Sequence, residues 1–237
     1  YEITYGDWSS DVCSSDLLLD SKSPAVRRVA AEALGRIGGE KSIEPLLRAS
    51  GEESRALEHS LTYALIELSL PGATRVALTS PDLSSRRRAL IALDQIPGAQ
   101  LKAADIVPYL SSENQPLREA ARWIASRHPE WSDEIVAWLR EAQAKKSISL
   151  ADTETLLLAL VSSSAAQDLT AAWADAKQSA ELRLLALRIM AHAVVAKTPQ
   201  VWFEKLATAI DGGTPEIRAT AIDAARSMRD RKSTRLN

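Results

Sequence analysis

Three histidines, His59, His128 and His192, are the side chains of this sequence best suited to bind a metal ion or to transfer a proton. A metal site needs several histidine or carboxylate ligands that converge on one point. Only His59 has an acidic neighbour, Glu58, whereas His128 is predicted to lie in a turn and His192 on a separate helix. The pattern therefore predicts no metal site, no catalytic residue and no cofactor.

Both ends of the sequence resemble translated DNA of non-biological origin. Residues 7–17, DWSSDVCSSDL, and residues 230–237, DRKSTRLN, can be translated from one short-read sequencing adapter that is read on opposite strands. We therefore interpret residues 1–17 and 230–237 as adapter-derived, and residues 18–229 as a repeat region truncated at both ends. The only cysteine, Cys13, falls in the first segment, so residues 18–229 contain no disulfide, thiolate ligand or cysteine nucleophile.

A basic run, Arg86-Arg87-Arg88, is the best candidate for contact with nucleic acid, and Arg27-Arg28 is its shorter counterpart. Binding to duplex DNA needs many phosphate contacts, but three consecutive residues point in different directions around a helix. Without the three basic and five acidic residues of the two end segments, the formal net charge of −2 becomes zero. We expect these arginines to form ion pairs on a solvated face, and we expect no nucleic-acid partner.

Tryptophan is frequent in a sequence that is only 5% aromatic. An exposed row of tryptophans could bind a peptide. Their helical spacing among leucines and alanines favours burial between repeats instead. The residues concerned are Trp123, Trp131, Trp138, Trp173 and Trp202.

A repeated pattern predicts the elements that position these side chains. A small or apolar residue followed by arginine opens an alanine-rich amphipathic run, at intervals of about 30 residues. One helix pair cannot bury its apolar face alone, so a period of this size predicts stacked helix pairs. The arginines are Arg27, Arg86, Arg118, Arg183 and Arg218, and Glu58 takes the same position between the first two.

The helical periodicity predicts an all-α chain without strands. In the first unit one apolar stripe is expected, formed by Val26, Val29, Ala30, Ala33, Leu34 and Ile37. Gly38-Gly39 is expected to end that helix in the left-handed conformation, and Pro71-Gly72 and Pro97-Gly98 are expected to break later ones. The expected helices span about 24–37, 42–47, 54–68, 73–78, 84–96, 105–110, 115–127, 131–142, 150–161, 165–176, 180–195, 199–210 and 214–228.

Two aspartates suggest how successive helices are held together. Asp20 precedes Arg27 by seven residues, and Asp211 precedes Arg218 by the same interval. An aspartate in the turn can accept a hydrogen bond from the arginine that opens the next helix, and such a partly exposed pair contributes about 0.2–1 kcal/mol. We therefore expect both pairs to form.

The segment DSKSPAVRRVAAEALGRIG, residues 20–38, resembles the short bacterial HEAT-like repeat of the phycobilisome-lyase type. A turn residue, a proline, an apolar-Arg pair and an alanine-rich helix are the marks of that repeat. The signatures of tetratricopeptide and ankyrin repeats are absent. This resemblance implies an α-solenoid of about six to seven HEAT-like helix pairs in residues 18–229.

A narrower resemblance covers mainly residues 55–140. The segments RALEHSLTYALIEL (55–68), RRALIALDQIPG (87–98) and LREAARWIASRHPEW (117–131) resemble the HEAT segment of large bacterial haem-binding CxxCH proteins. In that family a propeller-like dehydrogenase domain precedes the repeats and a cytochrome c module follows them, so the chemistry lies outside the repeats. The resemblance implies no catalytic residue here, and it implies a periplasmic location.

The function predicted from these features is that of a non-catalytic scaffold or spacer segment of a larger multidomain protein. Its expected partners are other proteins or flanking domains, and no membrane span is expected because no apolar run approaches roughly 18 residues. A free-standing HEAT protein-binding module is the alternative. A HEAT-fold enzyme of the DNA glycosylase or bilin lyase type is a third possibility, which the zero net charge and the lack of cysteine disfavour.

Overall fold

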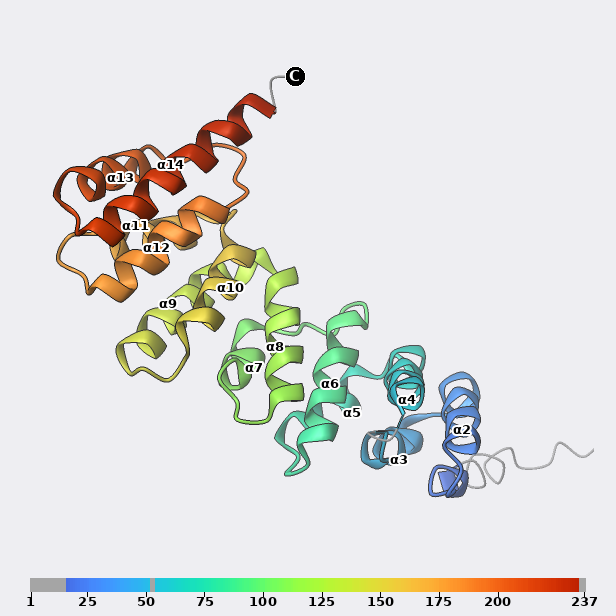
Figure 1. Cartoon of the computed structure of the whole chain (residues 1–237). Helices are drawn as coiled ribbons and strands as arrows, with labels where there is room; N and C mark the ends of the chain where they lie inside the picture. Colours follow the sequence, from blue (N-terminus) through green and yellow to red (C-terminus); the bar gives the residue numbers. More distant parts are fainter. Residues whose placement is uncertain (1–15, 52–53, 235–237) are drawn as a thin grey trace, which may run out of the picture. The chain divides into compact units, whose positions relative to one another are not determined.

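The computed structural model describes residues 16–51 and 54–234, and all regular structure in these ranges is helical (Figure 1). The segment 1–17, predicted to be adapter-derived, lies outside the described residues except for Asp16 and Leu17, and so do residues 235–237 of the second such segment. The chain divides into two compact units, Tyr1–Ile124 and Ala125–Asn237. We call them unit 1 and unit 2 and describe each by itself.

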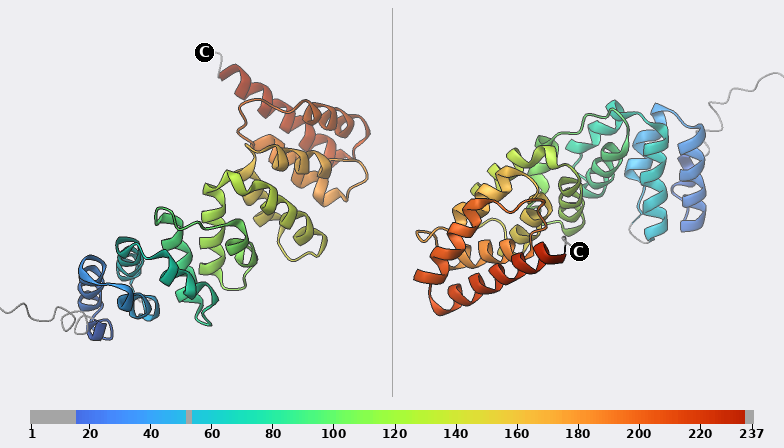
Figure 2. Two further views of the ribbon diagram at one scale, coloured as in Figure 1. Left: turned by 180° about the vertical axis from the view of Figure 1, so that it is seen from behind. Right: turned by 90° about the horizontal axis from the view of Figure 1, so that it is seen from above.

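The helices of unit 1 alternate between short and long, as expected for helix pairs. The long helices pack on one another in order, α2 on α4 and α4 on α6, and the short helices α3 and α5 pack on the long helices that follow them, α4 and α6. Figure 2 shows α2 and α4 running side by side. The elements are α2 (Pro24–Ile37), η1 (Glu40–Ser42), α3 (Ile43–Arg48), α4 (Arg55–Leu68), α5 (Pro71–Arg75), η2 (Val76–Thr79), α6 (Leu83–Gln95), α7 (Ala103–Ile106), η3 (Val107–Tyr109) and α8 (Gln115–Arg127), whose last three residues fall in unit 2.

Unit 2 stacks its helices in two rows. The first helices of its pairs, α9, α11 and α13, pack in sequence, and so do the second helices, α10, α12 and α14. Both units therefore have the α-solenoid arrangement that the repeat period predicts. The elements are η4 (Pro129–Trp131), α9 (Ser132–Ala144), α10 (Leu150–Leu160), α11 (Ser164–Trp173), α12 (Ala180–His192), α13 (Gln200–Gly212) and α14 (Pro215–Thr234).

Helix α2 begins as predicted, with Pro24 in its first turn, but it does not end as predicted. Gly38 is extended, with φ −75° and ψ −178°, and is not left-handed. A β-carbon at Gly38 would lie 2.4 Å from the carbonyl oxygen of Leu34 and 2.7 Å from Oγ of Ser42. Glycine is therefore needed here for close packing of the α2–α3 turn, and not for a positive φ.

The end of α4 also differs from the prediction. Ser69 ends the helix in the left-handed conformation, with φ 51°, and its N–H donates to the carbonyls of Ile66 and Leu65. Pro71 does not break α4 but lies in the first turn of α5, where the missing N–H of proline costs little. Helix α6 does end before Pro97-Gly98 as predicted, because Ile96, which precedes the proline, is extended with φ −76° and ψ 120°.

Asp82 caps the N-terminus of α6. Its carboxylate accepts hydrogen bonds from the backbone N–H groups of Ser84 (3.2 Å) and Ser85 (2.8 Å). Burial alone would raise the pKa of Asp82, but the hydrogen bonds from Ser85 and Ser84 and the charge of Arg88 together lower it below its usual value. The ionised cap therefore stabilises α6.

Replacing Asp82 by alanine is expected to lower the free energy of unfolding by about 0.5–2 kcal/mol, the usual contribution of such a cap. The carboxylate has a lowered pKa in the folded state, so its contribution is present above the pKa of the unfolded chain and is lost as the pH falls through the folded pKa. Urea unfolding at pH 7 and pH 3 measures both effects. The variant Asp82→Asn keeps an acceptor for the cap, and equal losses in both variants would contradict the capping role.

Candidate functional site

Helix α2 carries the most extensive apolar exposure of any described helix. Val29 and Ile37 are 58% and 57% exposed, and Val26 is 39% exposed. Ala30, Ala31 and Leu34, predicted to share one stripe with these residues or to adjoin it, are instead buried. The residues predicted to form one apolar stripe therefore lie on two faces of α2, one exposed and one buried. We call the exposed one, formed by Val26, Val29, Ala33 and Ile37, the α2 outer face.

The repeat register shows that this face is exceptional. When the long helices are aligned on Arg27 and its equivalents, the residues at the position of Val29 in α6, α8 and α12 are at most 8% exposed. Those at the position of Ile37 in α6, α12 and α14 are at most 9% exposed. The first set is Arg88, Ala120 and Leu185, and the second is Ile96, Ala193 and Met228. Positions that are both buried in α6 and α12 are therefore open on α2.

The last long helix has a different outer surface. The large exposed residues that follow its first turn are charged: Arg218, Asp223, Arg226 and Arg229. On α14 the positions equivalent to the α2 outer face include Ile217 and Ala224, and both are buried. Helix α2 therefore exposes apolar surface, whereas the described exposed surface of α14 is mostly polar.

The arginines that open the long helices do hold neighbouring turns, but the predicted acceptor of Arg218 is wrong. Nε of Arg218 donates to the carbonyl oxygen of Ile210 (2.9 Å), not to Asp211. Arg86 and Arg118 likewise donate to the carbonyls of Ser80 and Ser112 in the turns before their helices. The last carbonyls of a helix have no partner within that helix, so they are available acceptors.

In the first repeat, the arginine that opens the long helix donates to a carbonyl oxygen that lies later in the chain. Nη1 of Arg27 donates to the carbonyl oxygen of Ser50 (2.9 Å), beyond the end of α3. Arg27 is only 7% exposed. The hydrogen bond therefore ties α2 to the turn that precedes α4.

The basic run Arg86–Arg88 is occupied by contacts within unit 1. Arg88 is fully buried, and its Nη1 donates to the carbonyls of Leu46 (2.8 Å) and Leu47 (2.5 Å) at the end of α3. Its Nη2 lies 2.6 Å from Oε2 of Glu58, and Nη1 of Arg87 lies 3.0 Å from Oε1 of the same carboxylate. The run therefore links α3, α4 and α6. Arg87 and Arg88 form ion pairs as expected, but Arg88 lies in the core and not on a solvated face.

Other ion pairs join residues about one repeat apart. In unit 1, Nη1 of Arg75 lies 2.8 Å from Oδ2 of Asp105. In unit 2, Nζ of Lys205 lies 2.7 Å from Oδ2 of Asp175, and the hydrogen bond from Lys205 holds the pKa of Asp175 below its usual value. Sequence spacing alone did not identify these pairs, because the partner of each residue lies in the neighbouring repeat.

The three histidines lie in separate environments. His59 is exposed and stacks on Tyr63, with ring centroids 6.1 Å apart. His128 stacks on Trp131 at 3.8 Å, and its hydrogen bond to Glu130 lowers the pKa of that carboxyl group. His192 lies 3.6 Å from Glu154. In the described part of the chain, no three His, Cys, Asp or Glu residues form a group that could hold a metal ion.

The tryptophans divide between core and surface. Trp202 is 1% exposed, and its indole N–H donates to the carbonyl oxygen of Gln167 in the preceding repeat (3.1 Å). Trp173 is also buried, which agrees with the predicted packing between repeats. Trp131 and Trp138 are half-buried, and Trp123 is exposed on α8, contrary to that prediction. The described tryptophans therefore form no continuous exposed row.

Comparisons with known proteins match one segment of the sequence to a repeat family. Residues 26–52, from α2 through α3, match the family model of the PBS lyase HEAT-like repeat. This one segment is therefore similar to a HEAT-like repeat. Among solved structures the chain is similar to a designed armadillo repeat protein, YIII(Dq)4CqI, at 13% identity over 91% of this chain and 99% of that one, with a TM-score of 0.30. No curated protein matches the chain.

Stacking of the repeats accounts for the packing of the long helices, but it does not identify an activity. A repeat-solenoid fold suggests a non-enzymatic scaffold, and the α2 outer face is the surface most clearly available for a partner. None of the helices in the described ranges is long and apolar enough to cross a membrane.

Proposed function

We propose that this chain is a non-catalytic helical-repeat scaffold that contacts other proteins or other domains through the surface of its repeats. The repeat fold supports such a role, because stacked helix pairs create extended surfaces for binding. Each repeat contacts only its neighbours, so the separation between attached modules follows from the number of repeats between them. The proposed mechanism is therefore geometric and needs no reacting group.

The α2 outer face is the observation that carries this proposal. Val29 and Ile37 occupy positions that are buried in α6 and α12, and together with Val26 they are the large apolar residues of this face. Burying apolar surface contributes about 25 cal/mol per Å², so a further helical element that packs on this face would gain stability. A second helix packed against α2, as α4 is packed on its other side, is the contact we propose.

Unless another protein covers this face, the chain is expected to self-associate through it. The double variant Val29→Lys with Ile37→Lys places two charges on the face and should convert the chain to a monomer, because burying an unpaired charge in an interface is costly. Sedimentation velocity over a range of protein concentrations measures the change. Both residues are exposed in the structure, so the fold should be retained.

Val76 provides a matched control for this experiment. It is 72% exposed on η2 and stands apart from the α2 outer face, so Val76→Lys should leave the association unchanged. A wild-type chain that remains monomeric at high concentration, or a Val76→Lys variant that dissociates as completely as the double variant, would contradict the proposed role of the face.

We further propose that the scaffold belongs to a larger protein of the haem-binding CxxCH type. The support for this proposal is the resemblance of residues 55–140 to the HEAT segment of that family. Sequencing the source DNA across Leu17 and Arg229 with adapter-free primers tests both this proposal and the adapter interpretation. A strand-rich propeller sequence upstream and a Cys-x-x-Cys-His motif downstream are expected. Further helical repeats ending in a stop codon would overturn the haem assignment.

A further inference from the structure

Unit 2 contains a cavity of about 600 Å³ that the scaffold role does not use. It lies between the end of α12, the connection that follows it, the start of α13 and the last turns of α14. Small-molecule sites in proteins typically have volumes of about 300–1,000 Å³ and are lined mainly by apolar side chains. The size of this cavity falls within that range.

The floor of the cavity is apolar and well packed. Met190 is fully buried, Trp202 is 1% exposed, and Met228 is 9% exposed. The indole N–H of Trp202 is already bonded to the carbonyl oxygen of Gln167, so the ring presents only apolar surface to the cavity. At the rim, Val194 is 69% exposed and Phe203 is 46% exposed. The site therefore offers hydrocarbon contacts from its floor to its opening.

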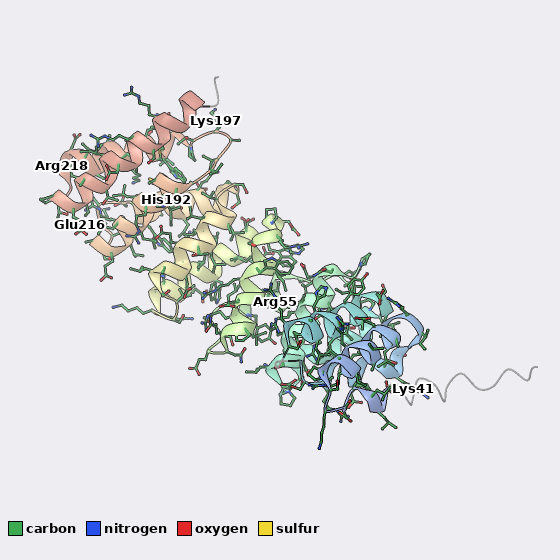
Figure 3. All side chains as sticks on the ribbon, turned by 45° about the vertical axis from the view of Figure 1, so that its right-hand side comes forward. Lys41, Arg55, His192, Lys197, Glu216 and Arg218 are labelled. Atoms are coloured by element: carbon green, nitrogen blue, oxygen red, sulfur yellow. The ribbon has the colours of Figure 1, made fainter. Side chains whose placement is uncertain are left out.

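The charged residues that line the cavity are all positive. Lys197 and Arg229 line the cavity, and no carboxylate is among its described lining residues. Figure 3 shows Lys197 near the end of α14, on the connection between α12 and α13. Neither cation has an ion-pair partner in the described part of the chain, which distinguishes them from Arg88, Arg188 and Lys205. Thr198 and Gln200 add polar groups beside Lys197.

We propose that this cavity binds a small apolar carboxylate, with its hydrocarbon part against Met190, Trp202 and Met228 and its carboxylate at Lys197 and Arg229. An apolar floor with unpaired cations favours a molecule that combines hydrocarbon surface with one negative charge. Lys197 and Arg229 are both exposed beside the cavity. A hydrogen bond between a cation and a carboxylate is stronger than one to a neutral hydroxyl. The site would make the scaffold responsive to a ligand while leaving its repeat packing unchanged.

Calorimetric titration of the full chain with decanoate tests the proposal, with decanol as the neutral counterpart of the same length. Decanoate should bind saturably to one site in unit 2. The dissociation constant of decanol should be at least about tenfold higher than that of decanoate. Lys197→Gln should weaken decanoate binding by a similar factor and leave decanol binding unchanged. Ala225→Phe, which places an aromatic ring in the cavity, should abolish binding of both.

The control is Lys41→Gln, because Lys41 is exposed in unit 1 and is a lysine remote in sequence from the cavity. The α2 outer face can also take up apolar molecules, but the unit 2 variants would not change that contribution. Circular dichroism shows whether each variant is folded. Equal weakening by Lys41→Gln and Lys197→Gln, or unchanged binding in a folded Ala225→Phe variant, would overturn the proposal.

Discussion

Replacing Glu58 by alanine is expected to lower the free energy of unfolding by about 3–5 kcal/mol, the usual effect of removing one partner of a buried ion pair. Glu58 neutralises Arg88, whose side chain is fully buried between α3, α4 and α6. Without the carboxylate, a buried guanidinium keeps only the carbonyls of Leu46 and Leu47 as partners. Stability of a typical domain is only about 5–15 kcal/mol, so the loss is large.

Hydrogen exchange of peptides from residues 43–95 measures this change, because it reports on unit 1 separately from unit 2. Arg87→Ala is the matched control: its side chain is 30% exposed and pairs with the same carboxylate, so the expected loss is about 1 kcal/mol or less. Exchanging the pair for apolar residues, with Glu58→Leu and Arg88→Met together, should restore part of the stability. Equal losses of unfolding free energy in Arg87→Ala and Glu58→Ala would show that the burial of Arg88 does not cause the large effect expected for Glu58→Ala.

Replacing Trp202 by alanine is expected to destabilise unit 2 by about 3–5 kcal/mol, as for other fully buried aromatic side chains. The ring is 1% exposed, and its N–H bonds to Gln167 across the repeat boundary. The substitution removes apolar contacts and leaves a carbonyl oxygen without that donor. Thermal unfolding followed by circular dichroism measures the loss without relying on the fluorescence of the residue that is removed.

Two further variants separate the contributions of this tryptophan. Trp202→Phe keeps most of the apolar volume and removes the donor, so a smaller loss of about 1–2 kcal/mol is expected. Phe203→Ala removes a neighbouring aromatic ring that is 46% exposed, and it should have little effect on stability. A loss in Phe203→Ala as large as that in Trp202→Ala would contradict the assignment of Trp202 to the core between repeats.

The sequence predicted the helices well because their signals are local. Pro24 and the apolar periodicity of residues 24–37 placed α2 correctly, and Ser54 marked the start of α4, where its side chain accepts a hydrogen bond from Leu57. The conformation of Gly38 was predicted wrongly. The reason is tertiary crowding: the space for a β-carbon is taken by Ser42 from the next helix, and helix-capping preferences do not include that contact.

The sequence by itself determined that this is an all-α chain of repeated helix pairs, because the repeat period and helical periodicity depend only on residue types along the chain. Only the tertiary structure decided which apolar residues are covered: Val29 and Leu34 are similar in character, yet one is exposed and the other buried. It also decided that Arg88 pairs with Glu58 and Arg218 with a carbonyl oxygen. These outcomes depend on neighbouring helices and turns, so they follow from packing and not from local pattern.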